Sequence, residues 1–418
     1  MRRGRPRART ALALVALLAL CACGSGEQEE RPVEPPAAAQ PARARPPGAR
    51  PSVLVLGLDG ADWHVLDPLI EAGYLPQLGA LVRGGARADL DCAPAHPETA
   101  CFCPPVWLSI STGVPESRHG IVFVTDTVAQ RKARALWTLL ALRGGTTTAV
   151  AWRNTWPPED SIRYVLTEDG LDWVADQRFK RWPATITLRM NRAESRARPL
   201  DLFEQLGLVP YSGPRRGANA ALARDRVSML ALLRLAPRDP TDLTLVLMHS
   251  PDKLAHLRWD TVQPEPGGPF DRAALLAQAQ AWRDAPDRAV ARATVASPYL
   301  EIDAWLGELF AAAHWDYVLV ASDHGMTRSR NPNDMPGQHG PHEPEAHIGV
   351  FALSGPGVRP GSRLGGIDVF DVAPTLAWLL GLPVARDLPG HVLLEAFQPD
   401  FVTAHPVAQV ASWEQSGP

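Results

Sequence analysis

Four segments of this 418-residue chain carry aspartate and histidine side chains that could bind metal ions. Taken singly, an aspartate after a strand is more often a helix cap, and Asp and His spaced four apart often form only a surface pair. Carboxylate and imidazole ligands together suit zinc-like divalent ions, whereas calcium and magnesium prefer oxygen ligands alone. Their recurrence in one chain therefore indicates a metal centre. The segments are GLDG with Asp59, SPDKLAH with Asp252 and His256, ASDHGM with Asp323 and His324, and GQHGPHEPEAHIG with His339, His342 and His347.

A cysteine stands where a nucleophile would be well placed, in the segment ETACFCPPVWLSIST. Pro104 and Pro105 open the apparent helix VWLSIST, since proline is favoured at the first helical positions. Cys103 would therefore lie at a helix N-terminus, where the helix dipole lowers the pKa of a thiol and a neighbouring metal ion would lower it further. A thiolate is a strong nucleophile, but it also binds zinc well, and tight ligation could hold it back.

The elements that must position these side chains follow from the apolar pattern of the chain. Apolar runs that end in turns predict buried strands, and helical patterns separate them. This alternation predicts an α/β fold with a mostly parallel central sheet covered on both faces. Because sites in such folds gather beyond the carboxyl ends of the strands, Asp59, Asp252 and Asp323 are expected to form one cluster. The expected strands lie in Ser52–Gly60, Thr146–Trp152, Leu243–Met248, Tyr317–Gly325 and Gly349–Gly357.

The N-terminus has the composition of an export signal. Five arginines precede the apolar run Ala11–Leu20, which is too short to span a bilayer comfortably and is followed by CACGSG. A cysteine directly after such a run resembles a bacterial lipobox, and Ala22 favours Cys23 over Cys21 as the lipidated residue; a plain secretory signal is the alternative. We therefore expect a bacterial cell-envelope lipoprotein, exported and held by a lipid anchor, facing the periplasm or in the outer membrane.

Composition then divides the chain into a signal, a spacer and one large folded domain. The spacer is rich in Pro, Ala and charge, with almost nothing to bury. A net charge of −3 and a pI near 6.5 argue against a nucleic-acid-binding surface, so no nucleic-acid polymer is expected as a partner. The expected boundaries are 1–23 for the signal peptide, 24–51 for the disordered linker, 52–400 for the catalytic domain with a cap insertion at about 155–240, and 401–418 for a C-terminal tail.

After lipidation, three cysteines would remain in an oxidising compartment: Cys92, Cys101 and Cys103. One disulfide among these three cysteines leaves one free thiol. The pairing Cys92–Cys101 closes a short loop and frees Cys103 for a reactive role, and we prefer it as a hypothesis. The pairing Cys92–Cys103 would silence the site.

The chain resembles the alkaline phosphatase superfamily and, within it, the type I phosphodiesterase/nucleotide pyrophosphatase group. The segments that carry the resemblance occur in the same order from about Val53 to Phe397: GLDG, PPVWLSISTGVPESRHGI, NTWPPE, DKLAH, SDHGM, GPHEPEA, SGPGV and DVFDVAPTLAWLLGLP. The resemblance implies an alkaline phosphatase-like, three-layer α/β sandwich. It also implies a metal-dependent hydrolase of phosphate esters, more often diesters than monoesters, whose substrate is a small-molecule, lipid or nucleotide phosphate ester.

By motif, the resemblance implies two divalent metal ions, with zinc the expected metal, that assist an in-line displacement at phosphorus. Site 1 would be held by Asp252, His256 and a later histidine, and site 2 by Asp59, Asp323 and His324. For the later histidine we favour His342, because GPHEPEA resembles the Gly-x-His stretch of the family. His339 in QHG is the rival, and His347 is a weaker one.

Cys103 stands where the family has a Thr or Ser nucleophile, and this departure leaves three hypotheses. The thiolate could attack phosphorus directly. Cys103 could instead be oxidised to formylglycine, as in sulfatases and some phosphonate ester hydrolases of the superfamily, although their signal resembles Cys-x-Pro-x-Arg and Trp107 replaces the arginine here. Finally, the protein could be a catalytically inactive metal-binding lipoprotein.

Overall fold

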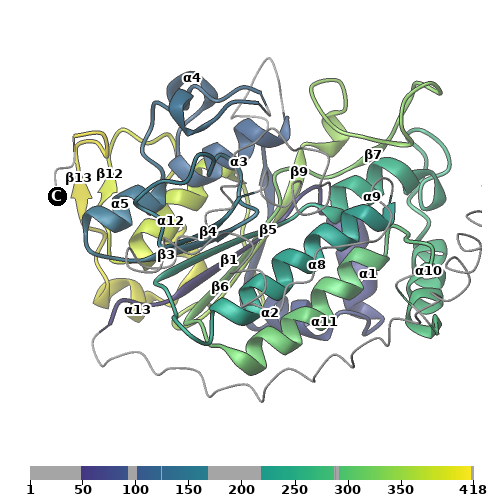
Figure 1. Ribbon diagram of the computed structural model, residues 1–418, viewed down its shortest axis with the longest axis horizontal. Coiled ribbons are helices and arrows are strands. Elements are labelled where there is room, and N and C mark those ends of the chain that lie inside the picture. The colour runs from purple at the N-terminus through teal and green to yellow at the C-terminus, as the bar shows by residue number, and fades with distance from the viewer. Residues whose placement is uncertain are drawn as a thin grey trace, which may run out of the picture. The chain divides into compact units, whose positions relative to one another are not determined.

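Figure 1 shows the computed structural model of the protein. It describes residues 49–92, 101–123, 125–167, 218–286, 288 and 291–415. The predicted signal peptide with Cys23, and the linker up to residue 48, lie outside the described residues. Among the described residues, no helix is both long and apolar enough to cross a membrane.

Within the described residues, nine strands form one central sheet (Figure 1). Along the sheet they are β10 (Ser362–Arg363), β2 (Ala86–Asp91), β9 (Ile348–Ser354), β6 (Tyr317–Ala321), β1 (Val53–Leu58), β5 (Leu243–Met248), β3 (Thr147–Val150) and β4 (Tyr164–Leu166), with β11 (Ile367–Asp368) also paired to β2. Strand β9 runs antiparallel to both of its neighbours, and every other pair is parallel. The expectation of a mostly parallel sheet is therefore confirmed.

Helices cover both faces of the sheet because the buried strands are apolar on both sides. In β1, Leu54, Leu56 and Leu58 join the core on one face, whereas Val53 and Val55 join the core on the other. The three-layer α/β sandwich is thus confirmed. The first face is covered by α1 (Trp63–Glu71), α2 (Pro76–Gly84), α8 (Ala218–Leu235), α9 (Ser250–Arg258), α10 (Arg272–Asp284) and α11 (Ser297–Ala312), and the second by α3 (Cys103–Thr112), α5 (Leu136–Leu142) and α12 (Val372–Leu379).

The structure describes parts of the expected cap insertion and of the expected C-terminal tail. Helix α8 falls within the expected cap insertion, yet it packs beside α9 and α11 in the helix layer. Most of the remaining insertion, residues 168–217, lies outside the described residues, so the cap stays a prediction. In the expected tail, β13 (Gln409–Val410) pairs with β12 (Val384–Ala385).

The remaining short elements are α4 (Glu116–His119), α13 (Pro399–Ala404), β7 (Thr327–Arg328), β8 (Gly337–Gln338) and 3₁₀ turns at Val128–Gln130, Trp259–Thr261, Pro344–Ala346, Val369–Asp371 and Leu394–Ala396.

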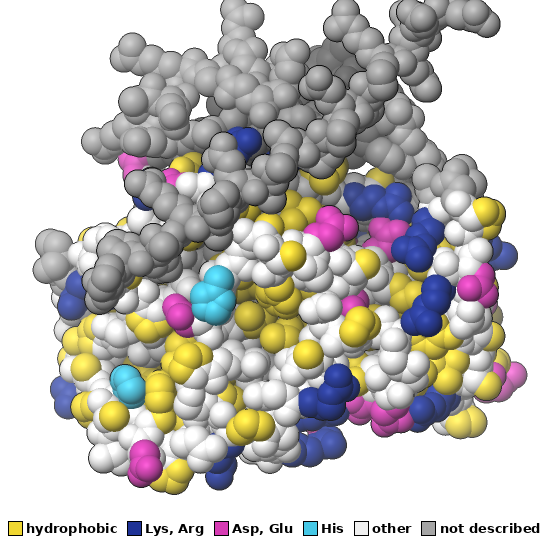
Figure 2. Space-filling model, turned by 90° about the horizontal axis from the view of Figure 1, so that it is seen from below, with side chains coloured by type: hydrophobic (Ala, Val, Ile, Leu, Met, Phe, Trp, Pro, Cys, Tyr) yellow, Lys and Arg dark blue, Asp and Glu magenta, His cyan; other side chains and the backbone are white. Residues whose placement is uncertain are grey.

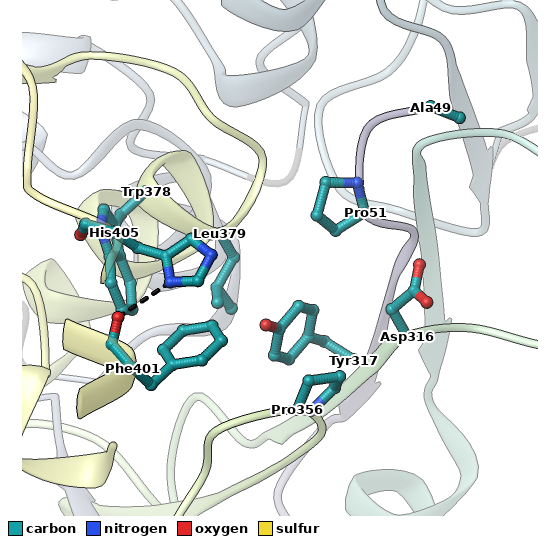
Figure 3. A pocket seen from close by; sticks show the side chains of 9 residues that line it. All are labelled: Ala49, Pro51, Asp316, Tyr317, Pro356, Trp378, Leu379, Phe401 and His405. Atoms are coloured by element: carbon teal, nitrogen blue, oxygen red, sulfur yellow. Dashed lines mark hydrogen bonds between the residues drawn. The ribbon is translucent and has the colours of Figure 1, made fainter. Parts of the chain in front are cut away.

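A cavity of about 300 Å³ opens where the chain enters β1 and β6 (Figure 3). Pro51 and Tyr317 line it together with the aromatic side chains of Trp378 and Phe401. Pro51 and Tyr317 lie at the amino ends of β1 and β6, and Trp378 and Phe401 belong to α12 and α13. None of the predicted site residues lines the cavity. On the molecular face shown in Figure 2, basic and acidic side chains are interspersed, and neither charge forms a continuous patch.

Candidate active site: a histidine and carboxylate cluster beside Cys103

The three predicted carboxylates converge at the carboxyl edge of the sheet. Asp59 follows β1 directly, Asp252 lies in the first turn of α9 after β5, and Asp323 follows β6. Strands β1, β5 and β6 are adjacent and parallel, with Leu58 in register with Met248, so their ends meet at one place. All three side chains are fully buried. The single cluster expected from the sequence is therefore present.

Gly60 allows these strand ends to approach one another. Its φ of +67° lies in the left-handed region that glycine adopts readily. A Cβ at this position would lie 3.0 Å from both Cα and Cβ of Asp252 and 3.3 Å from Cε1 of His324. A larger residue at position 60 would thus push Asp252 and His324 away from the turn that carries Asp59.

Among the described residues, the side chains form three overlapping groups, and within each group the candidate ligand atoms all lie within 4.8 Å of one another. One of them, Cys103 with His324 and His339, shares its members with the two groups that match the predicted sites. Group 1 contains Asp252, His256 and His339, and it corresponds to predicted site 1. Group 2 contains Asp59, Cys103, Asp323 and His324, and it corresponds to predicted site 2 with the nucleophile. The rings of His324 and His339 stack with centroids 3.6 Å apart, which joins the two groups.

Each of the three histidines has its Nδ1 beside a backbone carbonyl. His256 Nδ1 lies 2.8 Å from Gly337 O, His324 Nδ1 2.8 Å from Gly325 O, and His339 Nδ1 3.1 Å from Cys101 O. A carbonyl only accepts hydrogen bonds, so each Nδ1–H donates, and Nε2 of a neutral ring has a lone pair facing the cluster. Despite its burial, contact with Asp252 raises the pKa of His256, which favours a proton on its Nε2 that can donate to Asp252. Burial lowers the pKa of His339 to about 3 and also lowers that of His324, so both rings are neutral.

Three carboxylate oxygens face these nitrogens without a hydrogen-bond donor among the described residues: Asp59 Oδ1, Asp252 Oδ1 and Asp323 Oδ2. Asp252 Oδ1 lies 3.1 Å from His256 Nε2 and 3.6 Å from His339 Nε2. Electron-pair donors so close together repel one another unless a cation lies between them. The residues therefore fit divalent cations, and their mixture of oxygen, nitrogen and sulfur atoms suits a zinc-like metal.

The favoured histidine for site 1, His342, does not join the cluster. It is exposed in the turn after Gly340, whereas the rival His339 supplies an Nε2 to group 1. The reason is local: β8 pairs antiparallel with β7, and Gly337 accepts a hydrogen bond from His256, so the next residues bring His339 over α9. The weaker rival, His347, instead has its Nε2 3.0 Å from Gly340 O.

Cys103 is the first residue of α3, and Pro104 and Pro105 follow it as expected. Its Sγ lies 3.1 Å from His324 Nε2, and the residue is 7% exposed. Burial raises the pKa of the thiol well above its ordinary value, and the charges on Asp59 and Asp323 raise it further. In the protein alone, the pKa of the thiol is therefore raised, whereas we expected the helix dipole to lower it.

The disulfide joins Cys92 to Cys101 and leaves Cys103 as a free, buried thiol, which is the preferred pairing. Cys101 ties this bond to the site in two ways. Its carbonyl contacts Nδ1 of His339, and it lies two residues before Cys103. The disulfide therefore holds the backbone that positions both a candidate ligand and the candidate nucleophile.

Three basic residues were not singled out from the sequence. His249 Nδ1 lies 3.0 Å from Asp59 Oδ2, Lys253 Nζ donates to Asp252 Oδ2 at 2.7 Å, and Arg153 Nη2 lies 3.5 Å from Asp59 Oδ2. His249 and Lys253 stand at the end of β5 and in DKLAH, so their position next to predicted ligands could have identified them. Arg153 gave no such signal, because it belongs to a proline-rich loop after β3.

Charge and burial set the protonation of the carboxylates. Burial and the charge on Asp252 tend to raise the pKa of Asp59, but contact with His249 and the charge on Arg153 outweigh them and hold that pKa below its ordinary value. For Asp323, burial and the neighbouring carboxylates raise the pKa well above its ordinary value. When Asp323 is ionised, the three carboxylates carry one negative charge more than Lys253 and Arg153 supply, so a bound cation would favour that ionised form.

Trp152, which precedes Arg153 in the loop after β3, belongs to the core. It is 1% exposed, packs edge-on against Trp107 with ring centroids 5.2 Å apart, and donates its indole N–H to Ser111 Oγ at 2.9 Å. Trp156 is half-buried.

Comparisons with known proteins give one family model that covers most of the folded chain, one short match to a curated relative and several matches to solved structures. Human arylsulfatase K is 28% identical over 114 residues, which are 26% of this chain, and the match spans only 21% of that relative. Among solved structures, BT1596, a 2-O GAG sulfatase, has a TM-score of 0.51 at 12% identity and covers 88% of this chain and 76% of its own, a likeness that shows the fold. Murine ectonucleotide pyrophosphatase/phosphodiesterase 5 has a TM-score of 0.47 at 15% identity, with 83% and 100% covered. A family model for type I phosphodiesterase/nucleotide pyrophosphatase matches residues 53–343. This match covers more than half of the chain, so the protein belongs to the type I phosphodiesterase/nucleotide pyrophosphatase family.

Proposed function

We propose that the protein hydrolyses phosphate esters by attack of Cys103 on phosphorus, assisted by two zinc-like ions. Group 1 would hold one ion through Asp252, His256 and His339, and group 2 the other through Asp59, Asp323 and His324. The observation that carries the proposal is the set of buried carboxylate oxygens without donors, which face histidine Nε2 atoms beside a free thiol. When bound, two such ions would neutralise the carboxylates, lower the pKa of the thiol and stabilise the oxygens of an in-line displacement.

The chain's own residues then have defined tasks. In the first step, Cys103 Sγ forms a bond to phosphorus while the ester oxygen leaves with the bonding pair and takes up a proton as an alcohol. Water next displaces sulfur from phosphorus, which releases the phosphoryl group and restores the thiol. The helix start at Pro104 holds Cys103 beside group 2, where its sulfur lies 3.1 Å from the metal-binding Nε2 of His324 in the protein alone.

Turnover of p-nitrophenyl phosphate and bis-p-nitrophenyl phosphate by the zinc-loaded protein tests this proposal. Cys103→Ala should lower kcat/KM by at least ~100-fold, because the bond-forming atom is lost. His342→Ala, an exposed histidine three residues from His339, serves as the matched control and should keep full activity. Equal rates in the wild type and Cys103→Ala would remove the thiol from the reaction.

A sulfate or phosphonate ester hydrolase that uses a modified Cys103 is the alternative for the same site. The observation in its favour is the partial match to arylsulfatase K. Trp107, which stands where the conversion signal has arginine, is fully buried against Gly57, so this position is part of the core. The intact mass of the purified protein decides between the two, since an unmodified cysteine excludes a mechanism that needs formylglycine.

We infer further that the protein is exported and lipid-anchored at Cys23. The basic start, the apolar run and the cysteine that follows it support this inference. Labelled palmitate should be incorporated into the wild type in a bacterial host and lost in Cys23→Ala. Equal labelling of both proteins would refute the anchor.

A further inference from the structure

One arginine reaches the edge of group 2 from the loop after β3. Arg153 Nη2 lies 3.5 Å from Asp59 Oδ2, and its side chain is 12% exposed. The other carboxylate oxygen, Asp59 Oδ1, faces His324 Nε2 at 3.6 Å. The guanidinium therefore approaches Asp59 through the oxygen that does not face the ligand cluster.

The backbone around Arg153 is held in an unusual conformation. Ala151 and Asn154 have φ values of +56° and +53°, a left-handed region that non-glycine residues rarely occupy. Such residues persist where their surroundings hold them, and they gather at functional sites. Trp152 is locked in the core, and Thr155 Oγ1 donates to the carbonyl of Trp152 at 2.8 Å. The strained turn thus fixes one side chain, Arg153, beside the candidate active site.

The charges of the cluster indicate what Arg153 would meet there. Lys253 is paired with Asp252 at 2.7 Å on the side of group 1. On the side of group 2, Arg153 Nη2 lies 3.5 Å from Asp59 Oδ2, and Asp59 belongs to the same group as the nucleophile Cys103. With two divalent ions bound, the carboxylates would be neutralised, and the guanidinium charge would act on an anionic ligand.

We propose that Arg153 binds the nonbridging oxygens of the substrate phosphoryl group and thereby favours terminal phosphoryl groups over diesters. A guanidinium offers parallel N–H donors that match two oxygens of one phosphoryl group. A terminal phosphoryl group carries two negative charges and three nonbridging oxygens, whereas a diester carries one charge and two such oxygens. This inference rests on the proposed function, and it departs from the preference for diesters that the family resemblance implies.

Binding of inorganic phosphate and of dimethyl phosphate to the zinc-loaded protein tests the inference without turnover. In isothermal titration calorimetry, Arg153→Ala should weaken phosphate binding by about tenfold or more but dimethyl phosphate binding by less than about threefold. Arg153→Lys, which keeps the charge and loses the fork, should be intermediate. The control Arg363→Ala removes an exposed arginine paired with Asp89 and should change neither affinity. Equal losses for both ligands, or no phosphate binding by the wild type, would overturn the inference.

Two further measurements separate this inference from a structural role and from the proposed function. The zinc content of Arg153→Ala should equal that of the wild type; a loss of metal would show that Arg153 only positions Asp59, and the inference would fall. The ratio of kcat/KM for p-nitrophenyl phosphate to that for the bis ester should drop about tenfold in Arg153→Ala, and an unchanged ratio would also overturn it. If the wild type hydrolyses neither ester, the proposed function fails, while the calorimetric comparison still decides the role of Arg153.

Discussion

At the scale of single residues, the hydrogen bond that Nδ1 of a histidine donates decides whether its Nε2 faces the cluster as a candidate metal ligand. His339 and His342 are three positions apart and chemically identical, yet only His339 has its Nδ1 beside a buried carbonyl, that of Cys101. The same arrangement is present at His256 and His324. Ligand identity is therefore set by the backbone around the ring rather than by the local sequence motif.

This distinction leads to a prediction for metal content. His339→Ala should lose the ion of group 1, so that bound zinc falls from two ions to about one per chain after dialysis, because a zinc site needs most of its ligands. His342→Ala should retain both ions. Elemental analysis of the dialysed proteins gives the answer, and zinc lost from His342→Ala but kept by His339→Ala would restore the pattern expected from the motif.

A second residue-scale prediction concerns the turn after β1. Gly60→Ala should lower zinc affinity at least ~10-fold, because a Cβ there would press on Asp252 and His324 and the positive φ would be strained. Gly73→Ala is a matched control, since Gly73 has a similar φ of +74° with no atom within 4 Å of the added Cβ. Competition with a zinc-binding dye measures the zinc affinities of both variants. Similar affinities in the two variants would show that close approach at Gly60 is unimportant.

At the scale of elements, strand ends were predictable and loop geometry was not. The runs in β1, β5 and β6 are continuously apolar, so both their strand character and the aspartates that follow could be read from the sequence. The antiparallel direction of β9 could not, because a strand buried on both faces has the same composition in either direction. Likewise, the pairing of β8 with β7 that delivers His339 depends on hydrogen bonds between short segments with no periodic signal.

The link between β2 and α3 carries the element-scale prediction. Replacing both Cys92 and Cys101 with alanine should destabilise the protein by ~2–4 kcal/mol, since the bond closes a short loop. It should also weaken zinc binding, because the carbonyl of Cys101 orients His339. Urea unfolding and zinc titration measure the two effects separately. A stability loss with unchanged zinc affinity would mean that α3 and β8 hold His339 without help from the disulfide.

At the scale of the whole molecule, the fold gathers three buried carboxylates at one place, and Lys253 and Arg153 pair with only two of them, Asp252 and Asp59. Asp59, Asp252 and Asp323 are all fully buried at the edge of the central sheet. Burying like charges together is costly, and the raised pKa of Asp323 expresses that cost. Cations that bind only the folded state would stabilise it, by ~2.7 kcal/mol at a concentration one hundred times Kd. Metal binding and folding should therefore be coupled.

The variant Asp323→Asn should reveal this coupling through opposite effects with and without metal. An asparagine Oδ1 can still accept the hydrogen bond from Gly60, but the buried negative charge is gone. After chelation, the variant should therefore be more stable than the wild type by ~1–2 kcal/mol. With zinc the order should reverse, because the variant lacks a ligand of group 2 and gains less from the metal. Melting temperatures with chelator and with zinc measure both states, and Asp89→Asn, which changes an exposed carboxylate paired with Arg363, should leave both unchanged. If Asp323→Asn were less stable than the wild type by the same amount in both conditions, the buried carboxylates would owe their place to packing and not to bound cations.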